Sequence, residues 1–174
     1  MLDLPEVAFA GRSNVGKSSA LNCLLDAKKA ARVSARPGRT QAINLFRLGD
    51  QAVFADLPGY GFAKVPDHVK ARWGDMIEGY LGTREQLRMV VLLIDIRRDP
   101  MASDGLLIDG LLDAEIPLLV VATKADKLKR RQKTTQLRAI REGFGLPDGL
   151  PVAFSSVTRE GRDEVWDLIE EACR

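Results

Sequence analysis

The chain has 174 residues, of which 26 are basic and 24 acidic, and 45% of the residues are hydrophobic. This composition excludes a disordered, fibrous or disulfide-rich protein, and the length predicts one domain over residues 1–174. The formal net charge of +2 is too small to indicate a nucleic-acid partner by itself. No apolar run approaches the roughly 20 residues that span a bilayer, so we expect no contact with a membrane. Cys23 and Cys173 are far apart and lack metal-ligand spacing, which is typical of reduced thiols in a cytoplasmic protein.

The chain opens with a strand, a glycine-rich loop and a helix. Residues 5–10 predict a short buried strand, and a glycine loop from Gly11 to Gly16 follows it directly. Lys17 opens a helix whose apolar residues recur on one face, as packing on a sheet requires. These residues are Ala20, Leu21, Leu24 and Leu25. Because the strand lies so close to Met1, a trimmed start and a missing leading arm both stay open as alternatives.

The next part of the chain combines an irregular segment with a hairpin. Residues 28–40 are rich in Arg, Ser, Gly and Pro, which predicts a mobile loop. Residues 43–48 and 51–55 are strand-like runs on either side of Gly49-Asp50, and this spacing predicts an antiparallel hairpin. An apolar stripe at helical spacing follows, with Val69, Trp73, Met76, Ile77, Tyr80 and Leu81.

The second half of the chain alternates strands and helices. Continuous apolar runs at residues 89–94 and 117–122 predict strands covered on both faces, with a Leu-rich helical segment between them. Three elements complete the pattern: a helix over 127–144, a short strand over 152–154 and a helix over 160–173. This order predicts a three-layer α/β fold. Its mostly parallel six-stranded sheet would have one antiparallel edge hairpin and helices on both faces.

The glycine loop matches the phosphate-binding pattern G-x-x-x-x-G-K-[ST], the P-loop, with Gly11, Arg12, Ser13, Asn14, Val15, Gly16, Lys17 and Ser18. In such a loop the backbone N–H groups and the helix N-terminus cradle phosphates. Lys17 then reaches the β- and γ-phosphates, and Ser18 ligates Mg²⁺. The alternative is a glycine turn followed by a surface lysine, which the strand-then-helix context disfavours.

Two further segments point to the γ-phosphate and Mg²⁺. The first ends the hairpin and consists of Asp56, Leu57, Pro58 and Gly59. The carboxylate of Asp56 can face Mg²⁺ through water and the N–H of Gly59 can approach the γ-phosphate, although the same pattern also occurs as a plain turn. The second comprises Gly38, Arg39, Thr40 and Gln41, where Thr40 is the natural second hydroxyl ligand for Mg²⁺. Lys17 and Thr40 are the expected catalytic residues.

The nucleotide base is indicated by Thr123, Lys124, Ala125 and Asp126, which follow an apolar strand. A carboxylate at Asp126 accepts hydrogen bonds from the N1–H and the exocyclic amine of guanine, whereas adenine would leave it unpaired. A helix start with Asp126 in its first turn is the structural alternative. By position alone, the loop beneath the base is assigned to Ser155, Ser156 and Val157.

The sequence resembles the EngB family of bacterial GTPases, also called YsxC or YihA, over nearly the whole chain. The resemblance is carried by G-R-S-N-V-G-K-S-S, P-G-R-T-Q, D-L-P-G-Y-G-F-A-K-V, T-K-A-D-K and F-S-S. It implies a P-loop GTPase fold and Mg²⁺-dependent hydrolysis of GTP to GDP, linked to assembly of the large ribosomal subunit and to cell division and septation. The implied partner is a precursor of that subunit, through ribosomal RNA, ribosomal protein or both. We expect a monomer.

The resemblance also bears on the rate of turnover. Tyr60 stands where Ras-like proteins carry the glutamine that orients the attacking water, which predicts slow intrinsic hydrolysis. Related GTPases with an asparagine at the position of Asn14 use it to hold K⁺, which can replace an arginine finger. Arg36 and Arg39 are an alternative source of charge, although both are more simply solvated loop residues. Thr123 replaces the usual asparagine of N-K-x-D, and its hydroxyl can still bridge to the P-loop.

A run of positive charge occupies the helix after T-K-A-D, with Lys127, Lys129, Arg130, Arg131, Lys133, Arg138 and Arg141. Such a run is usually a solvated face, and a surface that contacts ribosomal RNA is the alternative that the resemblance favours.

Three functions are compatible with these motifs: a switching GTPase, a nucleotide-gated binding module with negligible turnover, and an ATP-dependent small-molecule kinase. The kinase has no use for Asp126.

Overall fold

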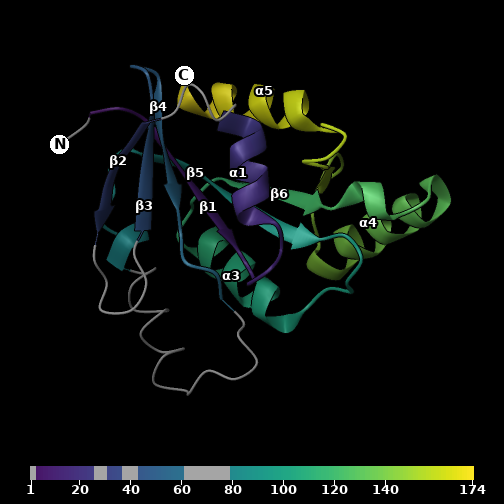
Figure 1. The fold of residues 1–174 in the computed structure, drawn as a ribbon. Coiled ribbons are helices and arrows are strands. Elements are labelled where there is room, and N and C mark those ends of the chain that lie inside the picture. Colours follow the sequence, from purple (N-terminus) through teal and green to yellow (C-terminus); the bar gives the residue numbers. More distant parts are fainter. Residues whose placement is uncertain (1–2, 26–30, 37–42, 61–78) are drawn as a thin grey trace.

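The computed structural model describes residues 3–25, 31–36, 43–60 and 79–174, and these contain one sheet of seven strands in the order β2-β3-β4-β1-β5-β6-β7 (Figure 1). The strands are β1 (Glu6–Gly11), β2 (Ala31–Arg36), β3 (Ile43–Leu48), β4 (Ala52–Asp56), β5 (Leu87–Asp95), β6 (Leu118–Thr123) and β7 (Val152–Ala153). The helices are α1 (Lys17–Leu25), α3 (Ala102–Asp113), the short 3-10 helix η1 (Ala125–Lys127), α4 (Arg130–Phe144) and α5 (Arg162–Cys173).

The strand β1 lies at the centre of the sheet and pairs in parallel with β4 on one side and β5 on the other. The strands β6 and β7 continue the parallel part beyond β5. All six residues of β1 are buried, which is what a parallel strand with helices on both faces requires. The carboxyl ends of these parallel strands therefore meet along one edge of the sheet.

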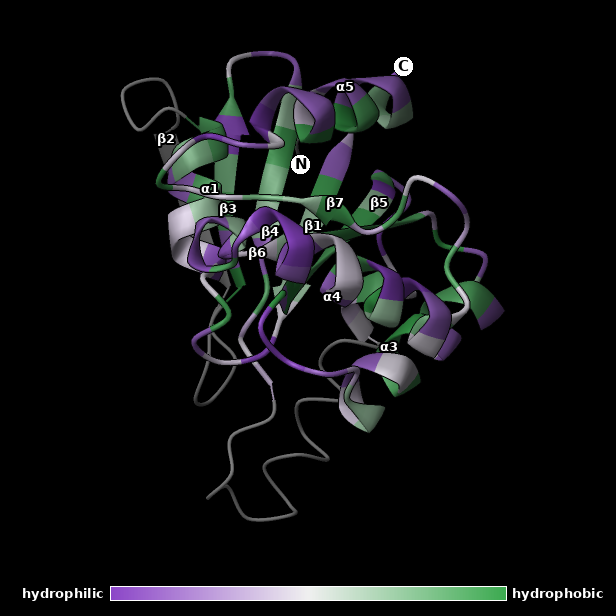
Figure 2. Ribbon diagram, turned by 90° about the vertical axis from the view of Figure 1, so that its right-hand side faces the viewer, coloured by the Kyte–Doolittle hydropathy of each residue, from purple (hydrophilic) through white to green (hydrophobic). Residues whose placement is uncertain are grey.

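Alternate residues of the strands enter two separate hydrophobic clusters. Val7 and Phe9 pack with the buried face of α1 and with α5, whereas Ala8 and Ala10 pack with residues of α3 and α4. Figure 2 shows the hydrophobic strands between helices whose outer surfaces are largely hydrophilic. The expected face of α1, with Ala20, Leu21, Leu24 and Leu25, is buried as predicted. This alternation confirms the three-layer α/β class.

The sheet has one strand more than the sequence predicted. We expected residues 28–40 to be irregular, but β2 lies within this segment and pairs antiparallel with β3. The predicted hairpin is present as β3 and β4, so the antiparallel edge contains three strands instead of two. The segment A-R-V-S-A-R alternates apolar and polar residues with the period of a strand, a signal hidden by its arginines and by the Gly and Pro that follow. The predicted helical stripe ran from Val69 to Leu81. Its members up to Ile77 lie outside the described residues, whereas residues 79–81 are helical, with Tyr80 buried in the core and Leu81 packed against it.

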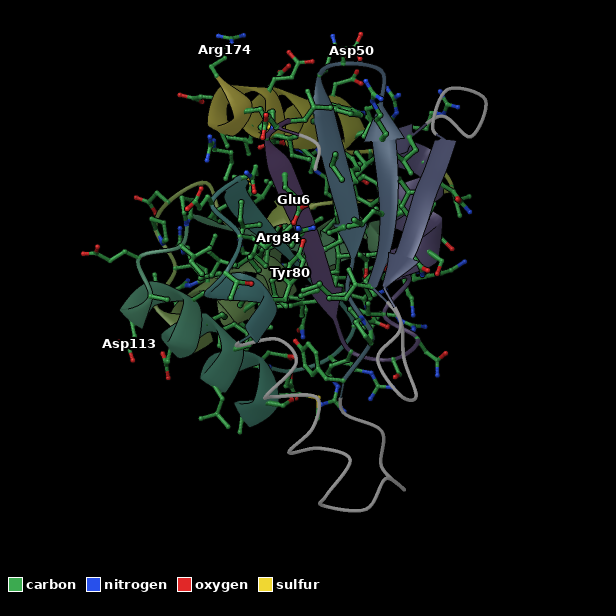
Figure 3. The ribbon with its side chains drawn as sticks, turned by 90° about the vertical axis from the view of Figure 1, so that its left-hand side faces the viewer. Glu6, Asp50, Tyr80, Arg84, Asp113 and Arg174 are labelled. Carbon is green, nitrogen blue, oxygen red and sulfur yellow. The ribbon has the colours of Figure 1, made fainter. Side chains whose placement is uncertain are left out.

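A buried polar cluster fixes the amino end of β1. The carboxylate of Glu6 accepts hydrogen bonds from Arg84, with Nη2 at 3.0 Å and Nε at 3.2 Å, and from the hydroxyl of Tyr80. The three side chains converge between β1 and the segment that precedes β5 (Figure 3). The guanidinium of Arg84 also lies 5.3 Å from the centre of the Tyr80 ring. Burial and the neighbouring carboxylate of Glu6 raise the pKa of Tyr80, so its hydroxyl stays protonated and donates.

We expect Arg84→Met to lower the free energy of unfolding by about 3 kcal/mol, because it leaves the buried charge of Glu6 without its cation. Urea denaturation of the nucleotide-free protein measures this change. The control is Arg138→Met, whose pair with Glu142 is exposed and should contribute little to stability. Equal losses in the two variants would contradict the role assigned to the cluster.

Candidate functional site

Loops from four neighbouring parallel strands meet at one edge of the sheet. The strands β1, β4, β5 and β6 end at Gly11, Asp56, Asp95 and Thr123. In open parallel sheets, ligands bind beyond the carboxyl ends of the strands. The three motifs predicted to contact phosphate, Mg²⁺ and base thus lie side by side, although they are far apart in the sequence.

The loop between β1 and α1 has the backbone of a phosphate cradle. Asn14 and Gly16 have positive φ angles of 65° and 98°. Such turns direct successive N–H groups toward one point, and the N-terminus of α1 adds its partial positive charge there. Ser13 contributes a buried hydroxyl with no hydrogen-bond partner among the described residues, a donor that a phosphate oxygen could satisfy. The residues therefore fit a polyphosphate.

Lys17 and Asp56 form an ion pair between α1 and the end of β4. Both side chains are largely buried, with exposed fractions of 12% and 15%. The hydroxyl-bearing Ser18 is exposed at the start of α1, and Asn44 Nδ2 lies 3.5 Å from Asp56 Oδ2. Hydroxyl and carboxylate oxygens are the hard donors that Mg²⁺ prefers, and Mg²⁺ commonly needs only one or two of them when phosphates complete its shell. The donor set fits Mg²⁺ bound together with a phosphate ligand.

The segment after β4 lies directly against the P-loop. The N–H of Ser13 donates to the carbonyl of Tyr60 at 2.9 Å, and the N–H of Tyr60 donates to the carbonyl of Gly11 at 3.3 Å. Gly59 packs so closely that an added Cβ would lie 3.2 Å from Ser13 Oγ. A side chain larger than hydrogen would therefore press on the phosphate loop. The structure brings the D-L-P-G segment and the P-loop together as predicted.

The hydroxyl of Tyr60 is engaged by helix α3. That hydroxyl is buried and donates to Asp104 Oδ1 of α3 at 2.7 Å. Beside it, Arg12 Nη1 donates to Ser103 Oγ at 2.7 Å. Burial and the charge of Asp104 raise the pKa of Tyr60, while burial raises that of Asp104 despite the tyrosine hydrogen bond. Tyr60 thus stands at the sequence position of the glutamine that orients water in Ras-like proteins, but its hydroxyl is bonded to Asp104.

The T-K-A-D segment is hydrogen-bonded to the P-loop. Thr123 Oγ1 lies 2.7 Å from the carbonyl oxygen of Val15, its nearer acceptor. The ammonium of Lys124 donates to the carbonyl of Asn14 at 2.7 Å. The hydroxyl of Thr123 therefore does bridge to the phosphate loop, as the sequence suggested for this replacement of asparagine.

Asp126 lies in η1, next to the loop that follows β7. Its Oδ1 accepts a hydrogen bond of 2.7 Å from the buried hydroxyl of Ser155, and its Oδ2 lies 3.2 Å from Lys127 Nζ. The N–H groups of Val157 and Thr158 in turn donate to Ser155 Oγ at 3.2 and 3.1 Å. The hydrogen bond from Ser155 and the charge of Lys127 lower the pKa of Asp126. The structure thus joins Ser155 to Asp126, whereas Ser156 and Val157 are exposed.

Sequence reasoning missed Asp95 at the end of β5. Its buried carboxylate bonds to Lys124 of the T-K-A-D segment and to Arg97. The signal was available, because a single acidic residue directly follows the apolar run over residues 89–94, at the same edge as Asp56. Gly38, Arg39, Thr40 and Gln41 lie outside the described residues.

Neighbouring acids partly neutralise the basic run around α4. Ion pairs join Lys127 to Asp126, Lys133 to Glu160, Arg138 to Glu142 and Arg141 to Asp148. Lys129, Arg130 and Arg131 are exposed, and no ion pair within the described ranges includes them. The cationic surface is therefore smaller than the sequence suggested and centres on the start of α4.

The comparisons with known proteins agree with this geometry. Residues 6–124 match a family model described as 50S ribosome-binding GTPase. The probable GTP-binding protein EngB of Geobacter metallireducens is 51% identical over 168 residues, which are 97% of this chain and 82% of that protein. Its counterpart in one Streptococcus pneumoniae strain is 49% identical over 170 residues, 97% of this chain and 87% of that protein.

Solved structures show the same likeness. A crystal structure of a probable GTP-binding protein EngB has a TM-score of 0.79 and 26% identity, covering 97% of this chain and 98% of that one. The G domain of the T. maritima FeoB iron transporter shares the fold, with a TM-score of 0.65, 24% identity, and coverage of 98% and 99%.

The fold and the site define a P-loop GTPase domain that binds guanine nucleotides. Within that class, the chain belongs to the EngB family of GTP-binding proteins. None of the helices in the described ranges is both long and apolar enough to cross a membrane.

Because the Tyr60 hydroxyl bonds to Asp104, Tyr60→Phe should lower the stability of the fold and leave the rate of GTP hydrolysis nearly unchanged. We expect the free energy of unfolding to fall by about 1–3 kcal/mol, since a buried carboxylate loses its donor. The single-turnover rate of GTP hydrolysis should change by less than about two-fold. A large fall in that rate with unchanged unfolding would assign the hydroxyl to the reaction. Asp104→Asn, which keeps an acceptor, is the matched control.

Proposed function

We propose that this chain is a Mg²⁺-dependent GTP switch with slow intrinsic turnover that acts in the assembly of the large ribosomal subunit. Nucleotide binding in this proposal is supported above all by the direct hydrogen bonds from Thr123 and Lys124 to the P-loop. These bonds hold the predicted guanine-binding and phosphate-binding segments at a fixed separation. One nucleotide can then span both segments.

On the phosphate side, Lys17 is proposed to contact the β- and γ-phosphates, and Ser18 and Asp56 to hold Mg²⁺ directly and through water. Thr40 is the proposed second hydroxyl ligand. When bound, Mg²⁺ neutralises charge on the β- and γ-phosphate oxygens as the bond between them breaks. Lys17 must leave its pairing with Asp56 to reach phosphate, and Asp56 is then available to the ion. The N–H of Gly59, which packs against Ser13, is the proposed donor to the γ-phosphate.

On the base side, Asp126 is proposed to accept the N1–H and the exocyclic amine of guanine. Its lowered pKa keeps it ionised at neutral pH, and Ser155 holds one carboxylate oxygen in place. Adenine offers neither donor and would leave this carboxylate unpaired, which argues against the ATP-dependent kinase.

Turnover is proposed to be slow because the hydroxyl of Tyr60 is buried on Asp104. Asn14 is exposed in the phosphate loop and is the proposed ligand for K⁺, which would supply positive charge at the γ-phosphate. The alternative is a nucleotide-gated binding module without significant turnover.

We expect K⁺, but not Na⁺, to accelerate single-turnover hydrolysis, and Asn14→Ala to remove the difference. The two salts are compared at equal ionic strength, with nucleotide affinity measured in parallel to separate binding from chemistry. Equal rates in K⁺ and Na⁺ would reject the K⁺ site. Negligible hydrolysis in both salts, even with ribosomal subunits added, would favour the binding module.

The ribosomal part rests on the matching family model and on the exposed cations at the start of α4. The model is described as a ribosome-binding GTPase, and ribosomal RNA is a polyanion. Lys129, Arg130 and Arg131 are free of ion pairs within the described part of the chain and can meet phosphates. In this proposal the protein acts as a monomer in the cytoplasm, where ribosomes are built, and effects on division and septation follow from that role.

We expect cosedimentation with large-subunit precursors to be stronger with GTP or a nonhydrolysable analogue than with GDP, and to weaken steeply as salt rises. Replacing both Arg130 and Arg131 by Gln should make the negative slope of log affinity against log salt shallower by about 2, because two phosphate contacts are lost. Arg138→Gln is the control, since Glu142 already pairs with Arg138. Binding that is insensitive to salt would point to ribosomal protein contacts instead.

A further inference from the structure

We propose that Asp95 is a positioning residue for guanine nucleotides, which it serves by holding Lys124 between the T-K-A-D segment and the P-loop. The proposal rests on the base site at Asp126. It adds a residue from β5, a strand that none of the sequence motifs includes.

The carboxylate of Asp95 is surrounded by donors. Its Oδ1 accepts the N–H of Arg97 at 3.1 Å and Arg97 Nε at 2.9 Å. Its Oδ2 accepts Arg97 Nη2 at 2.7 Å and Lys124 Nζ at 2.9 Å. The side chain is 5% exposed. Burial alone would raise its pKa, but the hydrogen bonds from Arg97 and Lys124 outweigh burial and hold the pKa well below its usual range. Asp95 is therefore a fixed anion.

Lys124 is held at both ends of its side chain. Its backbone has a φ of 63°, a left-handed conformation that residues with a Cβ seldom adopt. Its ammonium donates to the Asn14 carbonyl at 2.7 Å and to Asp95. Its Cε lies 3.6 Å from the position of a Cβ on Gly16. The ammonium of Lys124 thus links the phosphate loop to Asp95.

This anchoring matters because Lys124 is only two residues before Asp126. A nucleotide must contact Asp126 with its base and the P-loop with its phosphates, so the separation of the two segments has to match the ligand. A site that is already ordered loses less conformational entropy on binding and binds more tightly. Without the charge of Asp95, the ammonium loses one of its two partners and is drawn to the phosphates. The cross-link to Asn14 then loosens.

Arg97 provides an internal control. It supplies the other donors to Asp95, but it is 45% exposed and no described hydrogen bond or ion pair joins it to the P-loop. Its removal leaves the contact between Asp95 and Lys124 in place. A general structural role for Asp95 predicts similar effects of replacing either partner, whereas the positioning role predicts that only Lys124 shares the effect of Asp95.

The test is the dissociation rate of fluorescently labelled GDP from the full chain. Asp95→Asn and Lys124→Met should each raise the rate roughly ten-fold, the range expected for a lost hydrogen bond between charged groups. The double variant should be no faster than the faster single variant, because both changes remove the same link. Arg97→Met should change the rate less than about three-fold. An unchanged rate in Asp95→Asn, or effects that multiply in the double variant, would overturn the proposal.

Two further variants keep the result interpretable. Should Asp95→Asn fail to fold, Asp95→Glu keeps the charge but displaces it by one methylene, and an unchanged rate there would also overturn the proposal. Asp126→Asn tests the base site separately, through a shift in preference from GDP to xanthosine diphosphate. A shift in Asp126→Asn together with an unaltered rate in Asp95→Asn would reject only the positioning role. An unchanged preference in Asp126→Asn would instead reject the assignment of Asp126 to the base site.

Discussion

The parallel pairing of β1 with β4 and β5 is the constraint on which the rest of the structure depends. Because strands paired in parallel end at the same edge, this pairing brings Gly11, Asp56 and Asp95 together although they are far apart in the chain. Burial of every residue of β1 fixes the strand between two helical layers. The ion pair of Glu6 with Arg84 holds its opposite end. The phosphate loop therefore starts from the most constrained strand of the sheet.

The loops at that edge are joined to one another mainly through the P-loop. On one side, Thr123 and Lys124 contact the carbonyls of Val15 and Asn14. On the other, Tyr60 exchanges backbone hydrogen bonds with Gly11 and Ser13. Each neutral hydrogen bond contributes only about 1 kcal/mol net and the one from the Lys124 ammonium somewhat more, so these links are small beside the burial that holds the sheet. A change at the phosphates can then be transmitted to the segments on either side through contacts that are individually weak.

Local patterns were sufficient to predict the layers, the buried face of α1, the β3–β4 hairpin and the three motifs, because periodicity and turn residues encode them directly. The edge strand β2 was missed because its apolar and polar alternation is short and lies in a segment rich in arginine, glycine and proline. The partnership of Tyr60 with Asp104 joins residues 44 positions apart, and that of Asp95 with Lys124 joins residues 29 apart. Nothing in the neighbourhood of either residue encodes its partner. Such contacts depend on the packing of whole elements, which only the folded structure supplies.

The described part of the site is more fully assembled for binding than for turnover. Thr123, Lys124 and Asp126 are held by hydrogen bonds to the P-loop, to Asp95 and to Ser155. By contrast, Tyr60 places its hydroxyl on α3 and not toward the phosphates. A stabilising charge delivered in trans can accelerate GTP hydrolysis by several orders of magnitude. In the proposed switch, nucleotide is bound through ordered contacts, the hydroxyl of Tyr60 is engaged by Asp104, and the timing of hydrolysis is left to an added group. That separation suits the proposed switch, because the lifetime of its GTP state would then depend on the added group.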